Sequence, residues 1–339
     1  MGTLPRRFEP IRVLRKGGAC STFVATDQYL GRNEVVVRVI GKGNFVSDIR
    51  ELSEVFSWYR GLRHPFLSEV LDAGLTPKRD LFYVRNYHPE SEFFNSANRE
   101  SVKALVSAVD FLRGAGGVHG AIRPSNIFST SAGLKLTDPW TGRSSSNPQQ
   151  LGEEDIRFGA PEVLSDGVPS LDGDLYSLGA VLYRFFSGRD PFEASDPEFL
   201  RAKYIWATPR SLGSVSHVSR RIAEIVTNLL DKDPARRGPA FEALKNELEV
   251  ESVPALRAPA ISVGLKVDQV IRPPRTGRGL VVTLVQGPAG SGKSRLVEEL
   301  RGGVLLGDRV YRCKDCSTRW LRPLENTGMR KPQVWTQRR

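Results

Sequence analysis

The chain has 339 residues, 40% of them hydrophobic and 26% charged, which is typical of a globular protein with a buried core. It contains no apolar run of 18 residues, only three cysteines, and a polar, basic start without the apolar core of a secretion signal. These features predict no membrane-spanning helix, no disulfide framework and no secretion, so we expect a cytoplasmic protein.

The net charge of +11 lies almost entirely in the C-terminal part of the chain. Residues 251–339 hold 17 Lys or Arg against 7 Asp or Glu, whereas the first 250 residues hold 32 against 31. Such an excess suits nucleotides, nucleic acid or acidic lipid as partners, but a solvated, partly disordered tail has the same composition. The sequence does not choose between these alternatives.

The predicted elements begin with strands. Residues 8–40 are predicted as strands, most clearly the β-branched run at 34–40, which lies between two glycines. A helix is predicted over 47–62, and a second, short strand pair around 67–87. Together these elements predict a strand-rich lobe over about 8–88.

Helices are predicted after the strands, because apolar residues recur there at helical spacing. The ranges with this spacing are 102–113, 175–186, 222–230 and 240–248. They predict a helix-rich lobe over about 89–250. A stretch rich in proline, alanine and arginine at 251–279 predicts a linker.

Four short motifs occur in a fixed order along these two lobes. They are Arg63-His64-Pro65, Gly159-Ala160-Pro161-Glu162, Asp174-Leu175-Tyr176-Ser177-Leu178-Gly179 and Asp233-Pro234-Ala235-Arg236-Arg237. In this order they resemble the eukaryotic-type Ser/Thr protein kinase family, over residues 1–250. The resemblance implies a bilobal α+β fold with a β-rich N-lobe and an α-rich C-lobe.

The resemblance also implies structural roles for four residues. Asp174 would hold the backbone of the catalytic loop, and Glu162 would form an ion pair with Arg237. His119, in the catalytic loop, is interpreted as a packing residue that hydrogen-bonds within the fold. These roles concern the shape of the helix-rich lobe rather than its chemistry.

The residues that would carry phosphotransfer are replaced. Such a site needs a base that accepts the proton of the substrate hydroxyl, and lysines that hold the phosphates. Ala121 stands at the position of the base, and its methyl group accepts no proton. Arg38 and Arg123 stand at the two lysine positions, where a guanidinium keeps the charge but not the shape. The sequence therefore predicts that no catalytic residue is intact.

Some groups that could hold a nucleotide and a metal ion are retained. In the segment aligned with the glycine-rich loop only Gly17 matches the family pattern, Gly18 lies beside it, and Arg38 keeps a positive charge for the phosphates. Asn126 and Asp138 stand at the positions of the asparagine and the aspartate that bind Mg²⁺ in this family. ATP and Mg²⁺ are therefore candidate ligands of these five residues.

Other positions also depart from the family in ways that disfavour efficient phosphotransfer. Pro139 and Trp140 replace the Phe and Gly that follow the metal-binding aspartate, which predicts a loop fixed in one state. Arg85 stands at the gatekeeper position, where a buried cation would fill the adenine back pocket or need an acidic partner. Asp155 stands where the family has threonine, and Val55 where it has the glutamate that pairs with the phosphate-binding lysine.

A second resemblance lies near the C-terminus. The apolar run 280–285 leads into Gly287-Pro288-Ala289-Gly290-Ser291-Gly292-Lys293-Ser294, which matches the P-loop pattern of nucleotide-binding ATPases. Lys293 would reach the β- and γ-phosphates, and Ser294 would bind Mg²⁺. Only 45 residues follow Ser294, so we expect an incomplete α/β P-loop segment over 280–339 that binds nucleotide poorly.

The sequence favours a pseudokinase-like signalling protein, which regulates other signalling proteins by binding rather than by efficient phosphotransfer. A low-activity Ser/Thr kinase stays open as an alternative, because phosphoryl transfer depends largely on positioning and charge. A third alternative is that the kinase-like part is the sensor lobe of a larger P-loop ATPase regulator.

Overall fold

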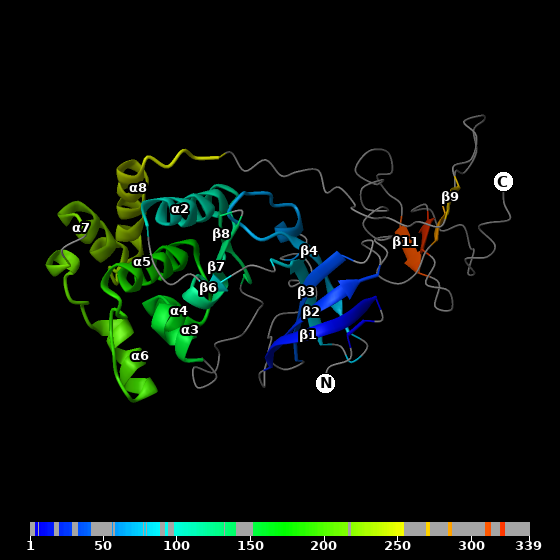
Figure 1. The fold of residues 1–339 in the computed structure, drawn as a ribbon, viewed down its shortest axis with the longest axis horizontal. Coiled ribbons are helices and arrows are strands. Elements are labelled where there is room, and N and C mark those ends of the chain that lie inside the picture. The colour runs from blue at the N-terminus through cyan, green and yellow to red at the C-terminus, as the bar shows by residue number, and fades with distance from the viewer. Residues whose placement is uncertain are drawn as a thin grey trace. The chain divides into compact units, whose positions relative to one another are not determined.

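The computed structural model describes the greater part of residues 4–253 and four short strands nearer the C-terminus (Figure 1). The described residues are 4–5, 7–16, 20–28, 33–41, 56, 58–76, 78, 80–88, 92–93, 98–131, 133–139, 152–215, 218–253, 269–271, 284–286, 309–312 and 319–322.

The chain divides into two compact units. The first comprises Met1–Thr3, Arg12–Val24 and Val35–Ala258, and the second comprises Leu4–Ile11, Ala25–Glu34 and Pro259–Arg339. Every residue of the site described below belongs to the first unit.

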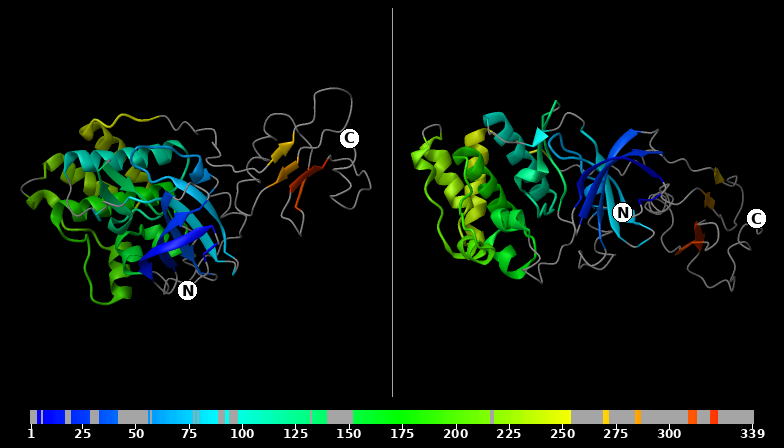
Figure 2. Two further views of the ribbon diagram at one scale, coloured as in Figure 1. Left: turned by 45° about the vertical axis from the view of Figure 1, so that its right-hand side comes forward. Right: turned by 60° about the horizontal axis from the view of Figure 1, so that its bottom comes forward.

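A five-stranded sheet forms the first lobe, with the strand order β1-β2-β3-β5-β4, and Figure 2 shows it in blue and cyan from two sides. Its strands are β1 (Phe8–Lys16), β2 (Cys20–Asp27), β3 (Asn33–Ile40), β4 (Val70–Leu75) and β5 (Leu81–Asn86). The valines of β3 and Ile40 are buried. Such β-branched side chains pack well on the pleated surface of a sheet, so this run forms a central strand.

The register between β3 and β5 decides which side chains share a face. The two strands are antiparallel, with Arg38 opposite Tyr83 and Val36 opposite Arg85. Successive side chains along a strand point to alternate faces, and side chains of opposed residues point to the same face. Arg38, Tyr83 and Arg85 therefore lie on one face of the sheet.

A smaller sheet with the order β6-β7-β8 begins the second lobe. Its strands are β6 (Glu92–Phe93), β7 (Ile127–Thr130) and β8 (Gly133–Leu136). The end of β8 is tied to the segment before β4, because the N–H of Leu136 donates to the carbonyl of Phe66 at 2.8 Å. In return, the N–H of Ser68 donates to the carbonyl of Leu136 at 2.9 Å. These bonds bring Asp138, two residues farther on, close to the first sheet.

The rest of the second lobe is helical. Its helices are α2 (Arg99–Gly114), α3 (Glu153–Phe158), α4 (Pro161–Asp166), α5 (Leu171–Ser187), α6 (Pro197–Trp206), α7 (Arg220–Leu229) and α8 (Arg237–Leu248), with 3-10 turns η1 (Pro124–Asn126), η3 (Leu212–Ser214) and η4 (Pro234–Arg236). Helix α5 is central, because it contacts α2, α3, α7 and α8.

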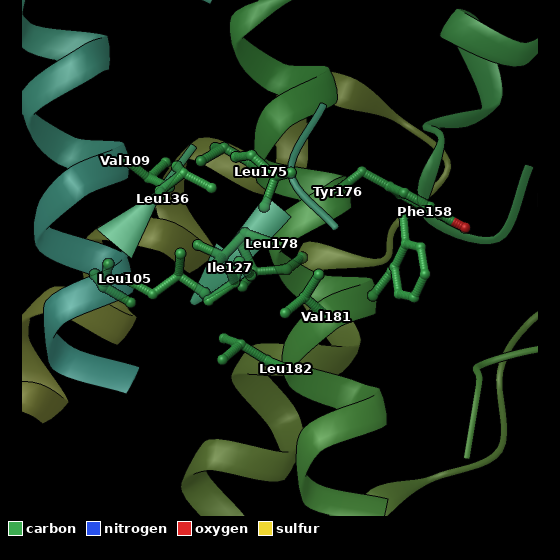
Figure 3. Packing of buried hydrophobic residues seen from close by; sticks show 14 of the residues in the cluster. Leu105, Val109, Ile127, Leu136, Phe158, Leu175, Tyr176, Leu178, Val181 and Leu182 are labelled. Atoms are coloured by element: carbon green, nitrogen blue, oxygen red, sulfur yellow. The ribbon is translucent and has the colours of Figure 1, made fainter. Parts of the chain in front are cut away.

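The core of this lobe is built around α5. Figure 3 shows side chains of α5, α2 and the small sheet in one cluster, among them Leu105, Val109, Ile127, Leu136, Leu175, Leu178 and Val181. Helix α7 lies close to α5 at Gly179, where an added Cβ would lie 2.8 Å from the Cβ of Leu229. The glycine at the end of the Asp174–Gly179 motif is therefore needed for this helix packing.

The predicted α+β fold is confirmed, because a strand-rich lobe precedes a helix-rich one. The four ranges predicted as helices coincide with α2, α5, α7 and α8 to within a few residues at each end. Of the helix predicted over 47–62, only Phe56 and residues 58–60 are described as helical, and residues 42–55 lie outside the described part.

Four short strands lie in the C-terminal part of the chain. They are β9 (Gln269–Ile271), β10 (Leu284–Gln286), β11 (Arg309–Arg312) and β12 (Arg319–Arg322), paired antiparallel in the order β11-β12-β10-β9. The P-loop motif lies outside the described residues, so the P-loop, the linker and the domain limits stay predictions. Within the described part of the chain, no helix has the length and apolar character to cross a membrane.

Candidate functional site

The loop from His119 to Asn126 is anchored to α5. The carboxylate of Asp174, in the first turn of α5, accepts the N–H of His119 at 2.6 Å and the N–H of Gly120 at 2.8 Å. Burial raises the pKa of Asp174 to about 7, although these two hydrogen bonds lower it. Gly120 has a φ of +67°, which glycine adopts without strain. This is the backbone contact that the family resemblance implies for Asp174.

His119 is buried and takes part in the same loop. Its Nδ1 accepts the N–H of Ala121 at 3.3 Å. Burial lowers the pKa of His119 to about 3, so the imidazole is neutral at pH 7. A buried, neutral histidine that bonds the loop backbone has the contacts of a packing residue.

Ala121 occupies the position of the expected base and lines a small cavity. The cavity has a volume of about 70 Å³, and Arg123, Glu154 and Asp155 also contribute to its wall. Both of these carboxylates are engaged: Asp155 pairs with the guanidinium of Arg123, and Glu154 accepts the hydroxyl of Ser125 at 2.5 Å. Each of these carboxylates therefore already has a partner within the chain.

Arg123 connects the catalytic loop to α3. Besides its pair with Asp155, its Nε lies 3.8 Å from a carboxylate oxygen of Glu154. Helix α3 begins with three acidic residues, which are favourable at the positive end of the helix dipole. An arginine–aspartate pair thus stands where the family has a lysine and a threonine.

Asp138 lies at the centre of a cluster of charges between the two lobes. Its Oδ1 accepts hydrogen bonds from Arg85 Nε and from the Tyr83 hydroxyl, each at 2.8 Å. Its Oδ2 lies 3.2 Å from Nη1 of Arg38. Only 9% of the Asp138 side chain and 8% of the Arg85 side chain are exposed. These opposite charges are therefore paired in a place with little water.

The pairing explains how these charges are tolerated in a buried place. Burial by itself raises the pKa of Asp138. The positive charges of Arg85 and Arg38 together have a larger effect in the opposite direction, so the pKa lies well below its ordinary value. The carboxylate is therefore ionised at pH 7. Of the two alternatives for the gatekeeper arginine, the structure shows the acidic partner.

Arg38 is held by three groups. Its Nε donates to the sulfur of Cys20 at 2.9 Å, and its Nη1 lies 3.4 Å from the hydroxyl of Tyr83, beside the pair with Asp138. Burial raises the pKa of Tyr83 well above its ordinary value, so the phenol stays neutral and donates its proton. The position of the Arg38 guanidinium is thus fixed by the protein.

The backbone at Asp138 is strained. Its φ is +55°, and Glu249 is the other non-glycine residue with a positive φ in the described part of the chain. Such a conformation costs roughly 1–2 kcal/mol. Asn126 helps to hold it, because its Nδ2 donates to the carbonyl of Asp138 at 3.2 Å and to that of Ala121 at 2.8 Å.

Asn126 and Asp138 are the predicted Mg²⁺ ligands, but their surroundings do not suit that ion. Mg²⁺ binds carboxylate and water oxygens at about 2.0–2.1 Å in octahedral geometry. Both oxygens of Asp138 already face guanidinium groups.

Glu162 and Arg237 form the ion pair that the motif order predicts. The pair is bidentate, with distances of 2.6 and 2.9 Å between guanidinium nitrogens and carboxylate oxygens. Arg237 is fully buried and also donates to the backbone carbonyls of Asp172 and Asp231. It thereby joins the start of α8 to α4 and to α5.

Several predicted site residues lie outside the described residues. They are Gly17, Gly18, Val55, Trp140, and Gly287, Gly290, Gly292, Lys293 and Ser294 of the P-loop. Conversely, sequence reasoning missed Tyr83, which bonds Asp138 and lies near Arg38. The sequence does indicate that Tyr83 and Arg85 share a face, because they are two residues apart in one strand. That this face also carries Arg38 follows only from the pairing of β3 with β5.

Comparisons with known proteins agree with the fold. Residues 20–248 match the family model of the protein kinase domain. The chain is similar to the probable serine/threonine-protein kinase PknB of Lactococcus lactis, with 22% identity over 68% of this chain and 39% of that protein. It is also similar to the serine/threonine-protein kinase PrkC of Bacillus subtilis, with 24% identity over 72% of this chain and 40% of that protein.

A plant protein shows higher identity over a smaller share of its length. The serine/threonine-protein kinase RUNKEL of Arabidopsis thaliana is 33% identical over 65% of this chain and 17% of that protein. The matched region covers less than half the length of each of these three curated relatives.

Proposed function

The chain belongs to the protein kinase family, with serine/threonine kinases among its relatives, and we propose that it is a pseudokinase-like regulatory protein. In this proposal the kinase fold binds other signalling proteins and does not transfer phosphate efficiently. The observation that carries it is the methyl group of Ala121 at the position of the base. Glu154 and Asp155, which line the same cavity, are engaged by Ser125 and Arg123.

The loss of the base alone would slow a kinase rather than stop it. A positioned base contributes about 10²–10⁴-fold, whereas positioning and charge stabilisation supply much of the remaining rate. A second defect supports the proposal, because the Asp138 carboxylate is paired with two arginines. Acceptance of the proton and binding of the metal ion are different steps, and both are impaired in this arrangement.

A low-activity Ser/Thr kinase is the second candidate. It is favoured by the names of the relatives and by the cations that stand at the two lysine positions, Arg38 and Arg123. Such an enzyme would rely on Asn126 and Asp138 for metal and on the arginines for charge stabilisation. A sensor lobe of a P-loop ATPase is a further candidate, which rests on sequence outside the described residues.

A phosphotransfer assay tests the proposal. The full chain is incubated with radiolabelled ATP, either Mg²⁺ or Mn²⁺, and casein as a generic protein substrate. We expect no transfer above that of a sample without the chain. Transfer that is lost in Asp138→Asn, but kept in a control with the exposed Arg184 replaced (Arg184→Met), would show an active kinase and contradict the proposal.

A further inference from the structure

The cluster of Arg38, Asp138 and Arg85 combines two positive charges with one negative charge. In phosphoryl-transfer sites, a divalent cation usually links such an aspartate to the phosphates of the nucleotide. We propose that the two arginines take the place of that cation here, so that the chain binds the phosphates of a nucleoside triphosphate without Mg²⁺. This inference rests on the proposed function, because it assigns a ligand to the same site.

The Asp138 carboxylate is satisfied by protein groups alone. Oδ1 accepts from Arg85 and Tyr83, and Oδ2 pairs with Arg38. Oδ1 already accepts two hydrogen bonds, and a metal ion at Oδ2 would have to lie beside the Arg38 guanidinium. The ion would also lie beside positive charges that repel it. The cluster is therefore complete without a metal.

The arginines are positioned by the sheet and not by a ligand. Arg38 lies opposite Tyr83 in the register of β3 and β5, and its Nε donates to Cys20. Arg85 donates from Nη1 to the carbonyl of Asn86 at 3.2 Å, and its guanidinium lies 5.8 Å from the ring centre of Phe128. Because these contacts form within the chain, both guanidinium groups are held in place before a ligand binds.

The charge balance of the cluster favours an anionic ligand. Asp138 neutralises one of the two arginines, so one positive charge is left over. The Arg38 side chain is 16% exposed, twice the value for Arg85, so Arg38 is the group that reaches a phosphate. A guanidinium suits this role, because its planar set of donors matches phosphate oxygens. Arg85 then acts as the fixed counter-ion of Asp138.

Calorimetric titration of the full chain with ATP tests this inference. The titration is run once in EDTA and once in excess MgCl₂. We expect the two Kd values to differ by less than about threefold. A Kd weaker by about tenfold or more in EDTA would overturn the inference, and so would the absence of ATP binding in both buffers.

A variant sharpens the test by removing one of the two cations that face the Asp138 carboxylate. Arg85→Met removes the cation from Oδ1 of Asp138, so ATP binding is expected to become about tenfold tighter with Mg²⁺ than in EDTA. Arg184→Met, which removes an exposed arginine of α5, is expected to behave as the wild type. Equal ATP affinity of Arg85→Met in the two buffers would count against the proposed role of Arg85.

A titration with MnCl₂ alone tests the wild-type chain, whether or not Arg85→Met folds. We expect no Mn²⁺ binding at this site. Binding that Asp138→Asn removes would show that the carboxylate does accept a metal ion, and would overturn the inference.

The phosphotransfer assay separates this inference from the proposed function. Metal-independent ATP binding together with phosphate transfer would overturn the proposed function and leave the inference standing. Metal-dependent ATP binding without phosphate transfer would overturn the inference and leave the proposed function standing.

Discussion

Two buried clusters of arginine and carboxylate lie in different parts of the kinase domain and differ in their relation to the family. In the helical lobe, Glu162 and Arg237 form the bidentate pair that the family resemblance implies. Between the lobes, Asp138 pairs with Arg38 and Arg85, two arginines at positions where the family has other residues. The contact that the resemblance implies for the helical lobe is present, whereas the partners of Asp138 are two arginines, and we propose that the phosphate site is rebuilt around these cations.

Loss of Arg237 is expected to have the largest effect on stability. Arg237→Ala leaves Glu162 without its partner and removes a fully buried side chain. Removal of one partner of a buried pair costs about 3–5 kcal/mol, and we expect a loss of that size in the free energy of unfolding, measured in urea.

The neighbouring Arg236 provides a matched control, because its side chain is 71% exposed and makes only surface pairs. Arg236→Ala is expected to change the free energy of unfolding by less than about 0.5 kcal/mol. Similar losses in Arg236→Ala and Arg237→Ala would remove the distinction between a buried scaffold pair and surface charge.

Loss of Asp138 tests the second cluster. Asp138→Leu leaves Arg38 and Arg85 without their carboxylate, and we expect a loss of about 3 kcal/mol in the free energy of unfolding. The loss in Asp138→Asn is expected to be smaller, because the amide oxygen still accepts one hydrogen bond. Unchanged stability in Asp138→Leu would mean that the two arginines do not depend on Asp138.

A change at Asp174 is expected to act on the catalytic loop. In Asp174→Asn one carboxylate oxygen becomes an amide nitrogen, so the N–H of either His119 or Gly120 loses its buried acceptor. This costs about 1–3 kcal/mol. Hydrogen exchange of the amide that loses its acceptor should become faster, and unchanged exchange at both amides would contradict the anchoring role.

The fold of the helical lobe was largely readable from the sequence. Apolar residues at helical spacing predicted α2, α5, α7 and α8, because these helices each bury one or more faces in a common core. The Glu162–Arg237 pair followed from the order of the family motifs. Short-range periodicity and the order of the motifs are enough to predict the structure where its contacts are the same as those of the family.

The partners of Asp138 were not readable in the same way. Arg38 and Arg85 were each identified as replacements, but their meeting at one carboxylate depends on the β3–β5 register and on the path of the chain after β8. The same holds for Arg123 and Asp155, which lie far apart in the sequence and form one ion pair. Contacts between distant segments are set by tertiary packing, which a local pattern does not contain.

The last expected effect is a change in the pH dependence of stability. His119 has a pKa of about 3 in the folded chain and an ordinary value of 6.5, so only the unfolded chain gains a proton between these pH values. The contribution of neutral His119 to the free energy of unfolding is therefore fully present above pH 6.5 and is lost as the pH falls below that value.

His119→Asn keeps an acceptor for the Ala121 N–H and removes this titration. Its free energy of unfolding should fall less steeply from pH 6 to pH 4 than that of the wild type, by up to about 1.4 kcal/mol per pH unit. Urea unfolding at several pH values measures the two slopes. Parallel slopes would show that His119 is not buried in its neutral form.

Restoring the base tests most directly the claim that the phosphate site was rebuilt as a whole. Ala121→Asp returns a carboxylate to the catalytic loop, while Asp138 stays paired with Arg38 and Arg85. We predict that phosphate transfer from ATP to casein by Ala121→Asp stays at the background rate, like that of the wild type. A rise of about 10²–10⁴-fold, which is what a positioned base contributes, would contradict the account and leave Ala121 as the single defect.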